Sequence, residues 1–267
     1  MKKLLAALVL SAAAWPFALR AQTYPDMRPV PRTTDRAVLS AQVLEREVRE
    51  RFRIGFEAEL QGRWREACVE FERIIVLHPA EPGFSSAYYD LGLARAQLRE
   101  YEAAAASFRA AVVRDPEFIA ARANLVSVDL LRNDLVAARR DADDLITRAP
   151  SSARALYERG VTALRSGDNA TALHDFGALL ASNPAYATGR YDLALAQIES
   201  GRLDDAEREL RSALALAPTY ARARFTLGVV ELRIGKKQDA RADFDRAAHD
   251  AQDVTLRNLA ISLRDAL

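Results

Sequence analysis

Residues 187–220 read ATGRYDLALAQIESGRLDDAERELRSALALAPTY, and this stretch contains the pattern that decides the fold. Two segments with apolar residues at three-and-four spacing are separated by Gly201, and Pro218 ends the second segment. Such spacing predicts amphipathic helices, and glycine and proline are typical of the points where helices end. The stretch therefore predicts two helices of about 12 to 14 residues joined by a turn.

The same pattern recurs along the chain with a fixed period. Pro116, Pro150, Pro184 and Pro218 follow one another at intervals of 34 residues, and Pro79 precedes them by 37. Counting back from these prolines gives the units 48–81, 85–118, 119–152, 153–186 and 187–220, and a sixth unit, 221–254, continues in register without its proline. The three extra residues, 82–84, predict a loop insertion. A period in this range indicates a repeat protein.

Each unit carries the same small and large side chains at fixed places. Twelve residues before each proline position stands an alanine: Ala67, Ala104, Ala138, Ala172, Ala206 and Ala240. Four residues later the units have Phe71, Phe108, Ala142, Phe176, Leu210 and Phe244. The expected turn between the two helices falls at Gly62, Arg99, Asn133, Gly167, Gly201 and Gly235. Small residues let paired helices approach closely, and large ones fill the space between units.

These units resemble the tetratricopeptide repeat family over about three quarters of the chain. The first-half tryptophan of the family pattern is replaced by Arg51, Tyr88, Arg122, Leu156, Arg190 and Arg224. The resemblance implies an all-α fold, an α-solenoid that forms a right-handed superhelix. It also implies a concave groove that is lined by the first helix of each unit.

The segments that flank the repeats predict a leader, a tether and two caps. Residues 1–21 have Lys2 and Lys3, an apolar run and a small residue at Ala21, as in a secretory signal peptide; an uncleaved anchor is the alternative. Residues 22–33 are rich in proline and predict an extended tether. From residue 34 the chain predicts a helical extension of the first unit, with Val38, Leu44 and Val48 on one stripe, and residues 255–267 predict a capping helix.

Composition argues against several classes of function. Lys and Arg number 38 and Asp and Glu 37, so no excess positive charge is present to bind nucleic acid. Cys68 is the one cysteine, which excludes an internal disulfide, and its apolar neighbours favour a buried residue over a reactive thiol. We expect no membrane insertion of the mature chain and a monomer.

Catalytic motifs find little support in the sequence. The histidines His78, His174 and His249 lie in different units and lack the spacing of metal ligands on one helix. No nucleophile elbow, phosphate-binding loop or dinucleotide fingerprint is present. We expect no enzymatic activity, no metal site and no cofactor.

The resemblance implies which residues face the groove. One row has Phe52, Tyr89, Ala123, Tyr157, Tyr191 and Phe225, and the row one turn later has Phe56, Leu93, Ser127, Val161, Leu195 and Val229. Asn124 and Arg154 are the polar candidates for holding a carboxylate, although Tyr89 and Leu93 stand where that kind of clamp needs Lys and Asn. The expected ligand is a polypeptide segment of another protein. The alternative is that the aromatic residues only support packing.

The resulting hypothesis is an exported adaptor in the periplasm of a Gram-negative bacterium, which binds an envelope protein in its groove. Two alternatives remain open. One is a solenoid subunit that associates with itself through an exposed end of the stack. The other is the non-catalytic subunit of an envelope enzyme complex.

Overall fold

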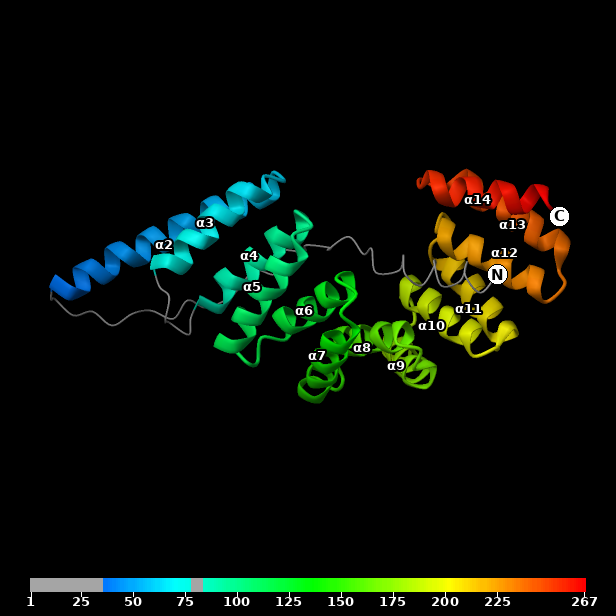
Figure 1. The fold of residues 1–267 in the computed structure, drawn as a ribbon, viewed down its shortest axis with the longest axis horizontal. Helices are drawn as coiled ribbons and strands as arrows, with labels where there is room; N and C mark the ends of the chain where they lie inside the picture. The colour runs from blue at the N-terminus through cyan, green and yellow to red at the C-terminus, as the bar shows by residue number, and fades with distance from the viewer. Residues whose placement is uncertain (1–35, 78–83) are drawn as a thin grey trace. The chain divides into compact units, whose positions relative to one another are not determined.

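The structure of the protein, a computed structural model, describes residues 36–77 and 84–267, with side chains from residue 43 onward. The expected signal peptide and tether, the side chain of Val38, and residues His78 and Pro79 lie outside the described residues. Within them the chain forms thirteen α-helices and no strand (Figure 1). None of these helices is both long enough and apolar enough to cross a membrane.

The helices have the following bounds: α2 Arg36–Leu60, α3 Trp64–Leu77, α4 Ser85–Gln97, α5 Tyr101–Arg114, α6 Ile119–Leu131, α7 Leu135–Arg148, α8 Ala153–Arg165, α9 Asn169–Ser182, α10 Ala187–Glu199, α11 Leu203–Leu216, α12 Ala221–Arg233, α13 Lys237–Asp250 and α14 Val254–Asp265. Most are 12 to 14 residues long, and α2, with 25 residues, is longer. The helix pairs from α4 to α13 fall within the units that the proline spacing defines, whereas α2 begins at Arg36, before the unit 48–81.

The described residues form two compact units that divide within α7, at Asp141. In the first unit α2 packs on α3 and α4 on α5, and α3 and α5 each also pack on the helix that follows. In the second unit the pairs are α8 with α9, α10 with α11 and α12 with α13, again joined to their neighbours along the chain, and α14 packs on α13. Helices packed in chain order are the defining feature of an α-solenoid, so the predicted fold class is confirmed.

The turn between the two helices of a repeat has one backbone conformation throughout. Positive φ angles occur at Gly62, Gly167, Gly201 and Gly235, between 70° and 89°, and at Arg99 and Asn133, with 61° and 60°. These are the six turn positions that the sequence predicts. Glycine adopts this conformation without steric cost and asparagine tolerates it, whereas arginine rarely does. Arg99 therefore adopts it at a cost that the glycines avoid.

The paired helices approach closely because the glycine of one helix faces the phenylalanine of the next. A Cβ atom built on Gly92 lies 2.6 Å from the Phe108 ring, and one on Gly160 lies 2.7 Å from Phe176. Phe108 is fully buried and also belongs to a core cluster with Leu125 and Val128 of the next repeat. One ring therefore fills the space within its own repeat and the space before the next one.

Arginine replaces the family's tryptophan in four repeats and makes polar contacts to the turn before it. Arg122, Arg190 and Arg224 each donate a hydrogen bond to the carbonyl oxygen of the proline six residues earlier, at 3.1, 3.0 and 2.8 Å. Arg190 also pairs with Glu209 at 2.7 Å, on the second helix of its repeat. These contacts tie the turn between repeats to the following helix pair.

Candidate binding surface on the first helices

The predicted groove residues all lie on the first helices of their repeats, but the structure buries most of them. Phe56 and Arg154 are exposed, and Phe52 and Tyr89 are partly exposed. The remaining eight are buried: Leu93, Asn124, Tyr157, Val161, Tyr191, Leu195, Phe225 and Val229. That Phe52, Phe56, Tyr89 and Arg154, the accessible positions, contact a partner stays a prediction.

Three aromatic residues that we expected to form an accessible platform lie in the core. The exposed fractions of Tyr157, Tyr191 and Phe225 are 5%, 1% and 0%. Each ring packs against a second-helix or turn aromatic; the centroids of Tyr157 and Phe176, for example, lie 6.1 Å apart. The structure therefore corrects the expectation of an accessible platform and favours the alternative that these rings support packing.

The two candidate carboxylate ligands are engaged within the protein. Asn124 donates a 3.2 Å hydrogen bond from Nδ2 to the Tyr89 hydroxyl. Arg154 pairs with Glu158 at 2.7 Å, on its own helix. Both side chains thus satisfy internal partners.

A regular polar contact joins the first helix of one repeat to the first helix of the next. The Tyr157 hydroxyl donates to Asp192 Oδ2 at 2.9 Å, over a separation of 35 residues. Tyr89 and Asn124 are also 35 residues apart, and here the direction is reversed: the Tyr89 hydroxyl accepts a hydrogen bond from Nδ2 of Asn124 at 3.2 Å. We call these positions the tyrosine–polar pairs. The sequence shows the spacing, but it does not reveal that the tyrosine hydroxyl forms a hydrogen bond inside the protein.

Tyr191 and Phe225 occupy the tyrosine place of the next two such pairs. Thr226 stands 35 residues after Tyr191; burial raises the pKa of Tyr191 to about 12, and the nearby Thr226 opposes the rise. Phe225 has no hydroxyl, and the residue 35 positions later is Ala260, whose methyl side chain needs no hydrogen-bond donor. Phe225 and Ala260 lie in one core cluster.

Ala123 also occupies the tyrosine place and is followed after 35 residues by the buried Glu158, which pairs with Arg154 on its own helix. A tyrosine hydroxyl therefore accompanies a polar group of the next helix at Tyr89, Tyr157 and Tyr191, and Glu158 has an arginine partner instead.

Among the described residues, the first pair has neither a tyrosine hydroxyl nor an arginine partner for its acid. Phe52 occupies the tyrosine place, and the corresponding position of the next repeat, after the three-residue insertion, is Asp90. Asp90 is 3% exposed, and its Oδ2 has no hydrogen-bond partner. Burial, and then the charge of Glu59, raise the pKa of Asp90 well above its usual value. Asp90 is therefore a buried acid without the donor that Asp192 has.

Glu59 on α2 is a second acid in this region without a partner. Its Oε1 is buried and accepts no hydrogen bond, and burial raises its pKa to about 7. Asp90 lies directly after the predicted groove residue Tyr89, but neither Asp90 nor Glu59 is among the predicted groove residues. The absence of a hydroxyl at Phe52 is the signal that would have identified Asp90.

An accessible apolar stripe lies next to these acids on α2. Phe52 and Phe56, one turn apart, stack with centroids 5.8 Å apart. Phe56 is 38% exposed, and Leu60, a further turn along, is 85% exposed. Large apolar side chains exposed along one helix face are a feature of interaction surfaces.

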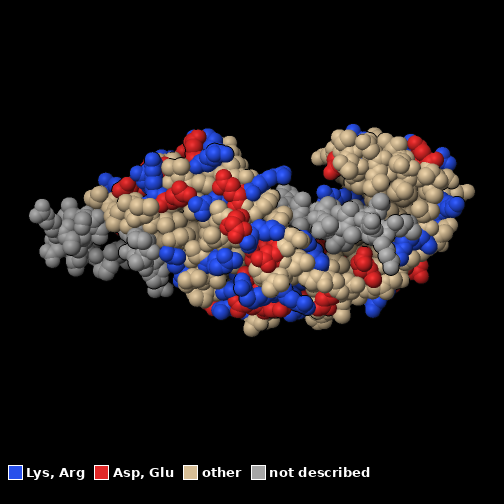
Figure 2. Space-filling model, in the orientation of Figure 1, with Lys and Arg blue, Asp and Glu red and all other residues tan. Residues whose placement is uncertain are grey.

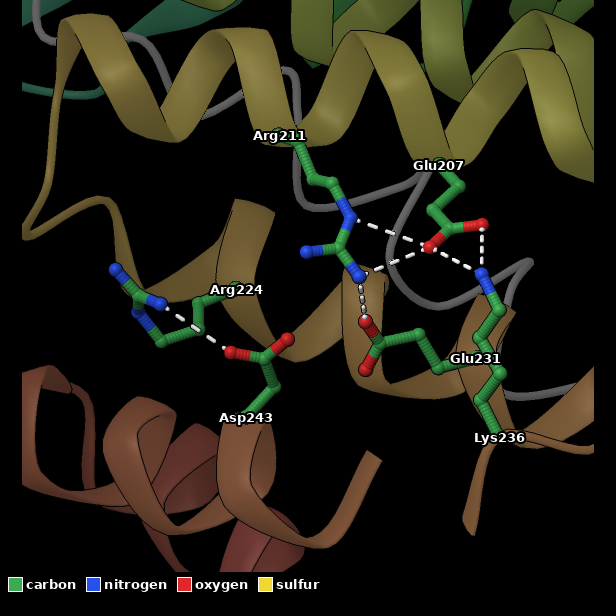
Figure 3. Close-up of polar contacts among 6 residues, drawn as sticks. All are labelled: Glu207, Arg211, Arg224, Glu231, Lys236 and Asp243. Atoms are coloured by element: carbon green, nitrogen blue, oxygen red, sulfur yellow. Dashed lines mark hydrogen bonds and ion pairs between the residues drawn. The ribbon is translucent and has the colours of Figure 1, made fainter. Parts of the chain in front are cut away.

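A network of ion pairs joins α11, α12 and Lys236, the residue just before α13, in the second unit (Figure 3). Glu207 accepts hydrogen bonds from Arg211 at 2.9 Å and from Lys236 at 2.7 Å. Arg211 also donates to the buried Glu231 at 2.7 Å. Burial and the neighbouring Asp243 raise the pKa of Glu231 to about 8. The network connects consecutive repeats.

The described residues offer little to metal or thiol chemistry. They contain no group of three or more His, Cys, Asp and Glu side chains placed to hold a metal ion. His174 and His249 are exposed. Cys68 is buried, as the sequence predicts, and burial raises the pKa of its thiol to about 11. A thiol with a raised pKa is a poor nucleophile at neutral pH.

Charged side chains of both signs are interleaved on the molecular surface. On the face shown in Figure 2, Lys and Arg alternate with Asp and Glu. Many are paired: Arg132 binds Glu102 at 2.6 Å, and Arg264 binds Asp245 at 2.6 Å. Exposed pairs of this kind contribute little to stability individually.

Comparison with protein families decides the assignment of the repeats. The tetratricopeptide repeat family matches residues 58–117, 132–187, 160–221 and 191–254, which together make up more than half of the chain. The chain belongs to the tetratricopeptide repeat family. A comparison with curated protein sequences gives no match.

Several solved tetratricopeptide repeat structures share the fold. A tetratricopeptide repeat protein from Parabacteroides merdae is 17% identical, with 82% of this chain and 99% of that chain covered and a TM-score of 0.60. The Cut9 and Hcn1 hetero-tetramer of APC/C is 17% identical, with 86% of this chain and 45% of that chain covered and a TM-score of 0.69. YrrB, a protein with an unusual peptide-binding site, is 17% identical, with 72% and 97% covered and a TM-score of 0.55. At these identities the likeness concerns the fold alone.

Proposed function

We propose that this tetratricopeptide repeat protein is a non-catalytic adaptor that binds a polypeptide segment of another protein on the first helices of its repeats. The observation that carries the proposal is the stripe of Phe52, Phe56 and Leu60 on α2, which exposes large apolar side chains on a first helix. The family membership supports it, and the peptide-binding site named for YrrB gives a precedent on the same fold.

The proposed setting is the periplasm of a Gram-negative bacterium, with an envelope protein as the partner and a monomeric adaptor. Support comes from the sequence of residues 1–21, which has the basic, apolar and small-residue parts of a secretory signal. Mature protein recovered from cells is expected to begin at Gln22 and to occur in the soluble envelope fraction. Retention of residues 1–21 in a membrane fraction would contradict the setting but not the adaptor role.

Binding on α2 is testable by placing a photo-crosslinking amino acid at single positions in native cells. Leu60, on the stripe, is the test position. Val76 on α3 is the control, because it is 77% exposed but lies outside the stripe. The adaptor role predicts a crosslinked polypeptide from position 60 and none from position 76. Crosslinks only between copies of this chain would instead indicate a self-associating subunit, and no crosslink from position 60 would refute binding at the stripe.

A further inference from the structure

Asp90 and Glu59, in the first compact unit, each have a buried carboxylate oxygen without a hydrogen-bond partner in the described part of the chain. These atoms are Oδ2 of Asp90 and Oε1 of Glu59. The raised pKa of each follows from burial, and no cation opposes it. An unpaired buried acid costs more free energy than a paired one, so a fold keeps it only where the remaining contacts offset the cost.

Neighbouring arginines do not serve these acids, because they are bound elsewhere. Arg53 on α2 pairs with Glu50 at 2.6 Å and with Glu57 at 3.1 Å. Arg95 on α4 donates to Ser107 at 2.8 Å and pairs with Glu72 at 2.7 Å. Neither arginine donates to Asp90 or Glu59 in the described part of the chain.

The position of Glu59 links the acids to the apolar stripe. Glu59 lies three residues after Phe56 and directly before Leu60 on α2, so its side chain is on the turn that carries both. Asp90 lies on α4, the first helix of the next repeat, and its pKa is raised by the charge of Glu59. Phe56, Glu59, Leu60 and Asp90 form what we call the acid–apolar face.

Resting on the proposed function, we propose that the acid–apolar face binds a polypeptide segment through one Lys or Arg side chain, which pairs with Asp90 and Glu59 while apolar neighbours of that residue cover Phe56 and Leu60. The cation supplies the donors that a tyrosine hydroxyl supplies to Asp192 in the second unit. An acidic segment would bring a third negative charge to the face, and an uncharged one would leave the carboxyl groups without a countercharge.

The first test selects peptides from a random 12-residue display library on the immobilised full chain. The proposal predicts enrichment of peptides with a Lys or Arg flanked by apolar residues. A selected peptide should bind the Asp90→Asn variant about tenfold or more weakly, as expected for the loss of a charge-assisted contact. Glu59→Gln should also weaken binding. The controls Glu57→Gln, on the same helix, and Asp192→Asn, in the second unit, should leave the affinity unchanged.

The second test supplies the missing donor from inside the protein. Phe52→Tyr places a hydroxyl at the position where Tyr157 has one. The two rings also pack in the same way, because the ring centroids of Phe52 and Phe71 lie 6.1 Å apart, as do those of Tyr157 and Phe176. The variant should raise the unfolding midpoint and weaken the same peptide, because Asp90 then has an internal partner. The control Phe225→Tyr faces Ala260 and should not raise the midpoint.

A third test measures the protons that are released when the peptide binds. Pairing with a cation lowers the pKa of a carboxyl group, so binding near neutral pH should release protons. Calorimetry with the selected peptide in buffers of different ionisation enthalpy should show release in the wild type and less release in Asp90→Asn. A merely structural role for Asp90 would leave the proton count unchanged.

The outcomes separate the two proposals. Selected peptides without a basic residue, or peptides whose affinity is the same for Asp90→Asn and wild type, would overturn the acid–apolar face and leave the adaptor role intact if position 60 still crosslinks to a partner. A library that gives no binder also overturns the inference. Failure of both selection and crosslinking refutes the adaptor role as well.

Discussion

The hydroxyl of Tyr157 lies 2.9 Å from Oδ2 of Asp192 and donates a hydrogen bond to it across the boundary between two repeats. Both side chains are buried, with Asp192 1% exposed. Burial raises the pKa of Asp192 to about 7, and the bond from Tyr157 opposes the rise. The Tyr157 hydroxyl therefore offsets part of the cost of burying the Asp192 carboxyl group.

Removing that donor should destabilise the protein. Tyr157→Phe keeps the ring and leaves Asp192 without its bond, so we expect a loss of about 1–3 kcal/mol in the free energy of unfolding. Urea unfolding at pH 7 measures it. Tyr220→Phe is the control, because the Tyr220 ring packs at a tilt against Tyr191, with the ring centroids 5.2 Å apart, and the variant keeps this ring. Equal effects of the two variants would show that the Tyr157 bond contributes nothing of its own.

The raised pKa of Asp192 makes stability depend on pH in a definite direction. The pKa is about 7 in the folded protein and about 3.9 in an unfolded chain. Between these values the folded state binds more protons, so the contribution of Asp192 to stability is fully present below about pH 3.9 and is lost as the pH rises through about 7. The slope is at most about 1.4 kcal/mol per pH unit.

Other buried acids also have raised pKa values and make the stability of the wild type depend on pH in the same direction. The prediction therefore concerns the difference in stability between the wild type and a variant that lacks the Asp192 carboxyl group. The free energy of unfolding of the wild type minus that of Asp192→Asn should fall as the pH rises from 5 to 8. A difference that stays constant over this range would mean that Asp192 titrates normally in the folded protein.

The repeat architecture is readable from sequence because it depends on residues with strong local preferences. The six turn positions all have positive φ, and the period places them without knowledge of tertiary structure. Likewise, the Gly92 and Phe108 positions recur in phase, and the structure brings them together. Such positions are dictated by backbone conformation and close packing, which repeat with the chain.

The binding surface is less readable, because a period does not say how deeply a side chain is buried. Tyr191 and Phe56 belong to neighbouring rows of the predicted groove, yet Tyr191 is in the core and Phe56 is accessible. The difference arises from neighbouring repeats: the aromatic Tyr220 covers Tyr191. Burial at these places is a property of the assembled stack, and the sequence alone does not give it.

The glycine and phenylalanine contact predicts a steric cost at one glycine and a gain at another. Gly92→Ala places a methyl group 2.6 Å from the buried Phe108 ring, so overpacking should lower stability by about 1–3 kcal/mol. Gly177, inside α9, has nothing within 4 Å of a built Cβ atom. Gly177→Ala should instead raise stability by up to about 1 kcal/mol, because alanine favours helix. Thermal melts of both variants decide this, and the same sign for both would refute the packing argument.

The ion network of the second unit gives the last prediction. Arg211 donates to Glu231, which is fully buried and has a pKa of about 8, whereas Glu207 keeps Lys236 as a second partner (Figure 3). Arg211→Met should therefore leave Glu231 without its cation and lower stability by about 1–3 kcal/mol at pH 8. At pH 5 Glu231 is protonated and needs the cation less, so the loss should shrink.

Arg208→Met is the matched control, because Arg208 is exposed and pairs with Asp205 on the surface of the same helix. Surface pairs contribute about 0–1 kcal/mol, so its effect should be small at both pH values. Urea unfolding of the two variants at pH 5 and pH 8 makes the comparison. A loss in Arg211→Met that is the same at both pH values would show that the arginine acts through packing of its aliphatic part and not through the charge of Glu231.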